Sequence, residues 1–164
     1  MKSDVKISGN QVQITRIFNA PRERVFAAWK TRDQVERWSG CKDSTKVEVQ
    51  MDFRVGGTFT QKLHIRNVGE YTITGTYDEI VEPEKILYHV NLGPATTQVA
   101  IEFIAQGNQT KVILTQVGFP DENLSRIVSE GTTESLDRLD QVLSGQVVLN
   151  PQATKRISTL KERR

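Results

Sequence analysis

One long helical pattern follows an almost unbroken series of strand patterns in this chain. Between residues 45 and 117, hydrophobic residues alternate with polar ones, which is the spacing of half-buried strands. After residue 120 the spacing becomes three and four, in a stripe formed by Leu124, Ile127, Val128, Gly131, Ser135, Leu136, Leu139, Val142 and Leu143. An antiparallel sheet has one apolar face to cover, and this stripe is the only large apolar surface available for it.

The N-terminal segment adds a strand and two short helices. Val12 and Ile14 alternate with polar residues up to Phe18, and the spacing becomes helical from Pro21, a residue that fits the first turn of a helix. A second short helix is predicted to end at Gly40. The predicted fold class is therefore α+β: a curved antiparallel sheet of about six to seven strands wraps around the long C-terminal helix, with two short helices after the first strand.

Two glycines interrupt regular patterns. Gly75 lies in the middle of a predicted strand, which suggests a bulge or a bend. Gly131 lies in the middle of the long helix, where glycine costs about 1 kcal/mol relative to alanine. We therefore expect another part of the chain to approach the helix closely at Gly131.

Residues 1–145 are expected to form one domain, and residues 146–164 a basic tail that is either a short helix or disordered. From Asn150 to Arg164, five basic residues accompany one acidic residue, so this segment has a net charge of +4 and the remainder −2. Because the positive charge is confined to the tail, without interleaved aromatic residues, the sequence disfavours nucleic-acid binding.

Several functional classes lack the residues that they require. No stretch approaches the ~20 apolar residues of a membrane span, and the first residues lack the layout of a signal peptide. Cys41 is the only cysteine, and no His, Cys, Asp and Glu cluster has the spacing of a metal site. The sequence therefore predicts a cytoplasmic protein with no metal and no cofactor.

Six segments between residues 18 and 143 carry a resemblance to a known superfamily. They are FNAPRERVFAAW (Phe18–Trp29), VERW (Val35–Trp38), VGGTF (Val55–Phe59), GTYDEIVEPEKILY (Gly75–Tyr88), FP (Phe119–Pro120) and EGTTESLDRLDQVL (Glu130–Leu143). Together they resemble the START-like (SRPBCC, helix-grip) superfamily, in the branch that includes polyketide cyclases and the C-terminal domain of activators of the heat-shock chaperone ATPase. The resemblance implies a deep apolar cavity between sheet and long helix, which relatives use for lipids, polyketides, sterols or hormones.

The chain departs from the family pattern at two positions. Relatives often carry two tryptophans before the glycine of the second short helix, where this chain has Trp38 and then Ser39. They also often carry a tryptophan after the glycine of the long helix, where this chain has Gly131 and then Thr132. Two interpretations stay open: the smaller side chains widen or polarise the mouth of the cavity, or they are drift in packing.

The inward faces of the predicted elements supply the candidate ligand site. Its predicted lining consists of Trp38, Phe59, Gln61, Leu63, Tyr71, Ile73, Tyr77, Tyr88, Val99, Ile101, Phe103, Phe119, Ile127, Gly131 and Leu136. Most inward apolar residues only fill a core, but a buried phenol needs a partner, so the three tyrosines are the candidates for orienting a ligand carbonyl or hydroxyl. By alternation, His64 and His89 point to solvent.

No residue stands out as catalytic, because the sequence has neither a nucleophile elbow nor a recognisable acid–base pair. The leading prediction is therefore the binding of a small hydrophobic or aromatic molecule, lipid- or polyketide-like, in the cavity between sheet and helix. Two alternatives remain open. One is a protein-interaction module resembling the chaperone ATPase activators, and the other is a cyclase- or lyase-type enzyme that uses the same cavity.

Overall fold

The computed structural model describes residues 2–145, which form eight strands and three helices. The elements in chain order are β1 (Asp4–Ser8), β2 (Gln11–Phe18), α1 (Arg22–Ala27), α2 (Arg32–Trp38), β3 (Ser44–Met51), β4 (Thr58–Ile65), β5 (Gly69–Val81), β6 (Lys85–Asn91), β7 (Thr96–Gln106), β8 (Gln109–Val117) and α3 (Glu122–Leu143). The predicted α+β class is confirmed. The predicted basic tail, residues 146–164, lies outside the described residues.

The strands form one antiparallel sheet in the order β1-β2-β8-β7-β6-β5-β4-β3. Strands β3 to β8 pair in chain order, and the β1–β2 hairpin joins the sheet along β8. The sequence-based strand count omitted β1, which pairs with β2 from Asp4 opposite Thr15 to Ser8 opposite Gln11. Most of β1 is exposed, so it lacks the apolar alternation that marks a strand in a sequence.

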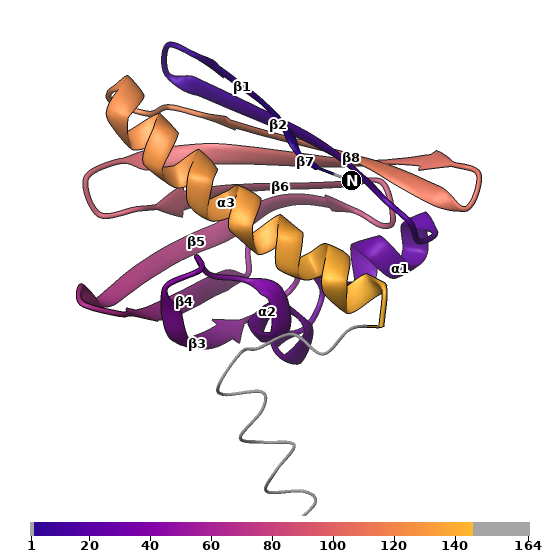
Figure 1. The fold of residues 1–164 in the computed structure, drawn as a ribbon, viewed down its shortest axis with the longest axis horizontal. Coiled ribbons are helices and arrows are strands. Elements are labelled where there is room, and N and C mark those ends of the chain that lie inside the picture. Colours follow the sequence, from indigo (N-terminus) through magenta and orange to yellow (C-terminus); the bar gives the residue numbers. More distant parts are fainter. Residues whose placement is uncertain (1, 146–164) are drawn as a thin grey trace, which may run out of the picture.

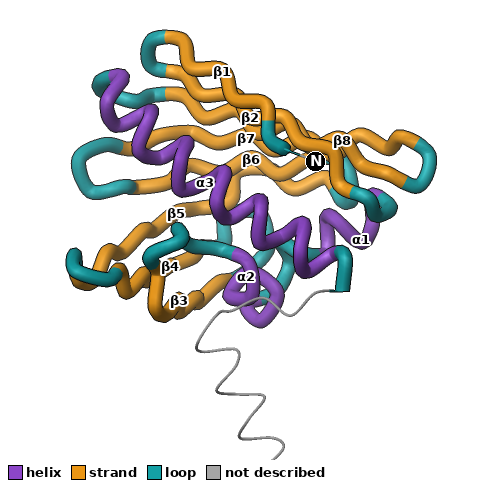
Figure 2. Tube along the Cα trace, in the orientation of Figure 1, coloured by secondary structure: helices purple, strands orange, loops and turns teal. Residues whose placement is uncertain are grey.

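The helices lie on one side of the sheet (Figure 1, Figure 2). Helix α3 runs diagonally across this face, with α1 and α2 near its C-terminal end. It packs against β1 and β2 along one side and against α2 along the other. No helix within residues 2–145 has both the length and the hydrophobicity needed to cross a membrane.

Aromatic side chains hold the two short helices on the sheet. The ring of Phe26 in α1 meets that of Phe103 in β7 with centroids 5.0 Å apart, and Trp29 meets the same ring at 5.1 Å. Trp29 also packs on Trp38 at 4.8 Å, and the Trp38 indole N–H donates to the carbonyl of Ala28 at 3.0 Å. Edge-to-face ring pairs contribute about 0.5–1.5 kcal/mol each beyond their burial. Both helices are therefore fixed over one end of the sheet.

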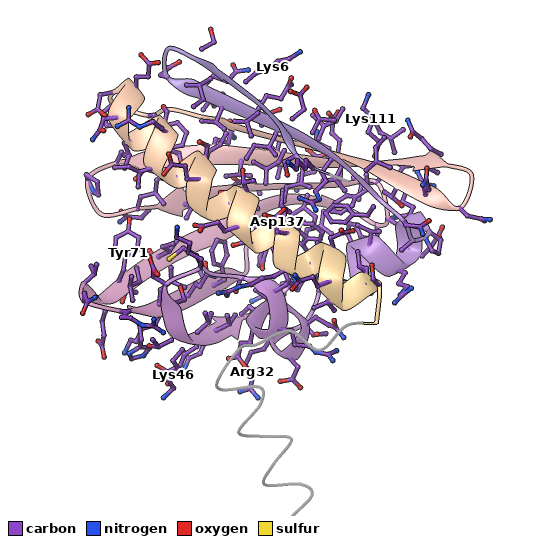
Figure 3. The ribbon with its side chains drawn as sticks, viewed as in Figure 1. Lys6, Arg32, Lys46, Tyr71, Lys111 and Asp137 are labelled. Atoms are coloured by element: carbon purple, nitrogen blue, oxygen red, sulfur yellow. The ribbon has the colours of Figure 1, made fainter. Side chains whose placement is uncertain are left out.

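A buried arginine fixes α3 over β2. The Arg16 side chain is only 4% exposed, and its guanidinium forms ion pairs with Asp137 and, at 3.4 Å, with Asp140, one turn further along α3. Figure 3 labels Asp137 on the exposed middle of this helix. A buried cation is costly unless it is paired, so this contact allows the helix few alternative positions.

The surroundings of Gly75 and Gly131 differ from those predicted from the sequence. Pairing continues through Gly75, which lies opposite Phe59 and Val90, and the irregularity of β5 falls between Tyr77 and Glu79. The predicted bulge at Gly75 is therefore wrong. The residue is small because the Phe59 ring lies over it: an added Cβ would overlap that ring and stand 2.6 Å from the carbonyl of His89.

The close approach predicted at Gly131 is also wrong. The nearest atom to an added Cβ there is the Cβ of Cys41 at 3.9 Å, which is an ordinary van der Waals distance. The helix is therefore not in tight contact at this point, and room remains beside it.

We predict opposite effects on stability for two glycine substitutions. Gly75→Ala forces the Phe59 ring out of its position and is expected to lower the free energy of unfolding by about 1–3 kcal/mol. Gly131→Ala, its control, replaces a poor helix former without a clash and is expected to raise it by about 0.5–1 kcal/mol. Urea denaturation of both variants measures these changes. A stabilising Gly75→Ala would show that Phe59 does not require the glycine.

Candidate functional site

Two adjoining pockets lie between the sheet and α3. The inner pocket has a volume of about 170 Å³ and is bordered by α2. Its lining comes from Trp29, Val35, Trp38, Ser39, Val49, Met51, Phe59, Gln61, Tyr77, Tyr88, Leu114, Gln116, Thr132, Ser135 and Leu136. Strands β3 to β6 and β8 thus form its floor, and α3 forms its roof.

The outer pocket lies further toward the N-terminal end of α3 and has a volume of about 320 Å³. It is lined by Gly40, Cys41, Gln61, Leu63, Ile65, Tyr71, Ile73, Leu92, Leu124, Ile127, Val128, Gly131, Thr132 and Ser135. Gln61, Thr132 and Ser135 line both pockets, so the two spaces meet at these side chains. Ile127 lies at the surface, with 53% of its area exposed.

The structure distributes the predicted lining over three places. Six of these residues line the inner pocket: Trp38, Phe59, Gln61, Tyr77, Tyr88 and Leu136. Gln61 also lines the outer pocket, which five others share: Leu63, Tyr71, Ile73, Ile127 and Gly131. Val99, Ile101, Phe103 and Phe119 are buried in the core and line neither pocket.

The inner pocket combines stacked aromatic rings with polar groups that have few protein partners. Phe59 packs against Tyr77 and Tyr88 with centroid distances of 5.3 and 5.4 Å. Within residues 2–145, neither tyrosine hydroxyl has a hydrogen-bond partner, and the buried Ser39 Oγ has none either. The Gln116 amide donates to Thr97 Oγ1 at 2.8 Å. The two tyrosine hydroxyls are not among the buried unpaired atoms, so they are accessible from the pocket. Two hydroxyls without protein partners beside one mostly apolar pocket mark it as a candidate site.

Burial raises the pKa of both of these phenols. The pKa of Tyr77 is raised far above the ordinary value for tyrosine. The pKa of Tyr88 is raised likewise, first by burial and then by the neighbouring Tyr77. Both hydroxyls are protonated near neutral pH, as an ordinary tyrosine already is, and each can donate a hydrogen bond.

Tyr71 differs from the other two tyrosines because its hydroxyl has a partner in the protein. It donates to the carbonyl of Leu92, at the end of β6. Burial raises the pKa of Tyr71 as well. Figure 3 labels Tyr71 on the β5 side of α3. Its hydroxyl therefore supports the wall of the outer pocket rather than facing a ligand.

Polar contacts tie the loop after α2 to α3, beside both pockets. Arg138 donates to the carbonyls of Ser39 and Cys41 at 3.2 and 2.9 Å, and Ser135 Oγ donates to the carbonyl of Gly40 at 2.7 Å. The two positions where relatives often carry tryptophan, Ser39 and Thr132, both line the inner pocket.

The histidines lie away from the pockets, on the opposite face of the sheet. His64 contacts Glu48 at 2.9 Å, and this hydrogen bond lowers the pKa of Glu48. His89 contacts Asp78 at 3.0 Å. Within the described part of the chain, no group of three or more His, Cys, Asp and Glu residues is placed to hold a metal ion.

A sequence model of the family described as Activator of Hsp90 ATPase homolog 1-like protein matches residues 19–144. The chain belongs to this family. The resemblance to the START-like superfamily predicted from the six segments is thereby confirmed. The helix-grip fold of these proteins is one that supports ligand binding.

Solved structures share the fold of this Activator of Hsp90 ATPase homolog 1-like chain. Protein CV1439 from Chromobacterium violaceum has a TM-score of 0.73 and 22% identity, over 82% of this chain and 96% of its own. CalU16 from Micromonospora echinospora has a TM-score of 0.68 and 16% identity, over 88% and 87%. A protein from Rhizobium leguminosarum has a TM-score of 0.71 and 26% identity, over 89% and 100%. No curated protein matches the sequence significantly.

The sequence contained signals for pocket residues that were absent from the predicted lining. Gln116 shares the inward parity of Val112 and Leu114 on β8, and Ser135 belongs to the helical stripe. Both were omitted because the prediction selected mostly apolar and aromatic side chains. In this member of the Activator of Hsp90 ATPase homolog 1-like family, the few polar side chains of the lining distinguish the pocket from the apolar core better than the apolar side chains do.

We predict that removal of two tyrosine hydroxyls has unequal effects on stability. Tyr71→Phe leaves the Leu92 carbonyl without its donor and is expected to lower the free energy of unfolding by about 1 kcal/mol. Tyr88→Phe removes a hydroxyl of the inner pocket that has no partner in the described chain, and is expected to leave the free energy unchanged or raise it slightly. Urea denaturation near neutral pH measures both. Equal losses would indicate that Tyr88 has a protein partner in solution.

Proposed function

We propose that this protein binds a small hydrophobic or aromatic molecule, lipid- or polyketide-like, in the paired pockets between the sheet and α3. The observation that carries the proposal is the pairing of an apolar space with unpartnered polar groups. The outer pocket supplies aliphatic walls, and the inner pocket supplies the hydroxyls of Tyr77 and Tyr88. Ligand sites in proteins combine a mostly apolar concave surface with a few placed polar groups in this way.

The sizes of the pockets support this proposal. A cavity of about 150 Å³ holds a benzene molecule, so the inner pocket at about 170 Å³ has room for one ring. The outer pocket, at about 320 Å³, lies within the range of roughly 300–1,000 Å³ typical of small-molecule sites. The position of Ser39 and Thr132 at the inner pocket favours the interpretation that their small size shapes the cavity.

The test is a two-dimensional NMR titration with 1-naphthol and 1-octanol, an aromatic and a lipid-like probe. At millimolar concentration, signals of Trp38, Tyr77, Tyr88 and Ile127 are expected to shift. Thr132→Trp fills the junction of the two pockets and is expected to weaken binding at least about tenfold, which corresponds to the loss of about 1.4 kcal/mol of binding free energy.

The matched control is Glu130→Trp, which adds the same indole at an exposed position of α3 that lines neither pocket. It is expected to bind both probes as the parent protein does. Absence of any shift in the pocket signals with either probe would refute the proposed function.

A second candidate function is contact with a chaperone of the Hsp90 class, because the matching family is described by activation of that ATPase. The expected result is stimulation of the ATPase rate of a purified Hsp90 by the full chain. The Thr132→Trp variant serves as the control, because a surface-mediated effect does not require the pockets. No change in the ATPase rate with excess protein would remove this candidate.

A further inference from the structure

The inner pocket is the more polar of the two, and the outer pocket, which reaches the surface, is the more apolar. An amphiphile bound at a protein surface usually has the reverse arrangement, with its polar end toward the solvent. Both pockets are mostly apolar, and Gln61, Thr132 and Ser135 line both, but Tyr77, Tyr88 and Gln116 line the inner pocket alone. Aliphatic side chains make up a larger share of the outer pocket, where Ile127 reaches the solvent. A ligand that matches both environments therefore places its more polar end in the inner pocket.

Charge further restricts that polar end. None of the residues that line the inner pocket is an Asp, Glu, Lys, Arg or His. A carboxylate placed there would have no cation to pair with, and an ammonium no anion among the lining residues. Transfer of an unpaired ion from water into such a site is strongly unfavourable. The inner pocket therefore selects an uncharged group.

The available hydrogen-bond partners define the chemistry of this group. Tyr77 and Tyr88 have adjacent rings, with centroids 6.2 Å apart, and their hydroxyls are protonated near neutral pH. Each hydroxyl is therefore a donor that lacks an acceptor within residues 2–145. A carbonyl oxygen on the ligand can accept from such donors.

We propose that the ligand is an uncharged molecule whose ring-sized end bears a hydrogen-bond acceptor, most simply an aryl carbonyl. This end enters the inner pocket and accepts from Tyr77 and Tyr88, while the apolar end passes Gln61 and Thr132 into the outer pocket. The inference rests on the proposed function, and adds to it the charge, the acceptor and the orientation of the ligand.

The test compares four compounds with the same number of carbon atoms. Butyrophenone supplies the ring and the carbonyl, and butylbenzene replaces the carbonyl by a methylene. At pH 7, 4-propylbenzoate is an anion and 4-propylbenzylamine a cation. Butyrophenone is expected to bind at least about tenfold more tightly than either ion, as measured by NMR titration.

The role of the hydroxyls is tested by the ratio of butyrophenone affinity to butylbenzene affinity. This ratio is expected to fall about five- to tenfold in the double variant Tyr77→Phe with Tyr88→Phe, the loss typical of hydrogen bonds. The variant retains both rings and is expected to fold. Tyr71→Phe is the control, since its hydroxyl is bound to Leu92; it is expected to change both affinities by the same factor.

Orientation is read from nuclear Overhauser effects. Ring protons of butyrophenone are expected to contact Phe59 and Tyr88, and the terminal methyl to contact Leu63 or Ile73. The inference is overturned if either ion binds as tightly as butyrophenone, if the double variant leaves the affinity ratio unchanged, or if the contacts are reversed. In each of these cases continued binding of butylbenzene leaves the proposed function standing. If none of the four compounds binds, the proposed function itself fails.

Discussion

The position of α3 depends on the ion pairs that Arg16 makes with Asp137 and Asp140, and the pockets depend on the position of α3. These ion pairs hold one side of the helix on β2, and the helix also packs against β1 and β2 on this side. On its other side the helix is joined to the loop after α2 by side chains that donate to backbone carbonyls, through Ser135 and Arg138. Directional polar contacts thus hold both sides of the helix. The helix can therefore stay in place although side chains do not fill the space between it and β4 to β6.

The polar side chains around this space differ in whether they have hydrogen-bond partners in the protein. Two of these side chains have partners in the protein: Trp38 donates to the Ala28 carbonyl, and Tyr71 donates to that of Leu92. Tyr77 and Tyr88 instead contribute ring packing while their hydroxyls lack acceptors in the described chain. Under the proposed function, a second molecule supplies the acceptors for these hydroxyls.

Much of the fold was predictable because its signals are local or repeat along the chain. Alternation located β2 and the strands from β3 to β8, and the helical stripe located α3. The pockets were less accessible to sequence reasoning, because their polarity depends on contacts between distant segments. Nothing near Tyr71 in the sequence indicates that its hydroxyl reaches Leu92, and Gly75 resembles a bulge glycine until its pairing with Phe59 is known. Inward parity identified Val99 and Ile101 as readily as Tyr77, but only the last of these borders a cavity.

The buried Glu36 of α2 has a consequence for association between chains. Strand β3 is one edge of the open sheet, and the free side of an edge strand offers backbone groups to which another strand can pair. One of these groups, the Val49 N–H, already donates to a Glu36 carboxylate oxygen at 2.9 Å. A strand arriving from a second molecule would have to displace this carboxylate, together with the helix that carries it. The helix that borders the inner pocket therefore also protects the sheet against edge-to-edge polymerisation.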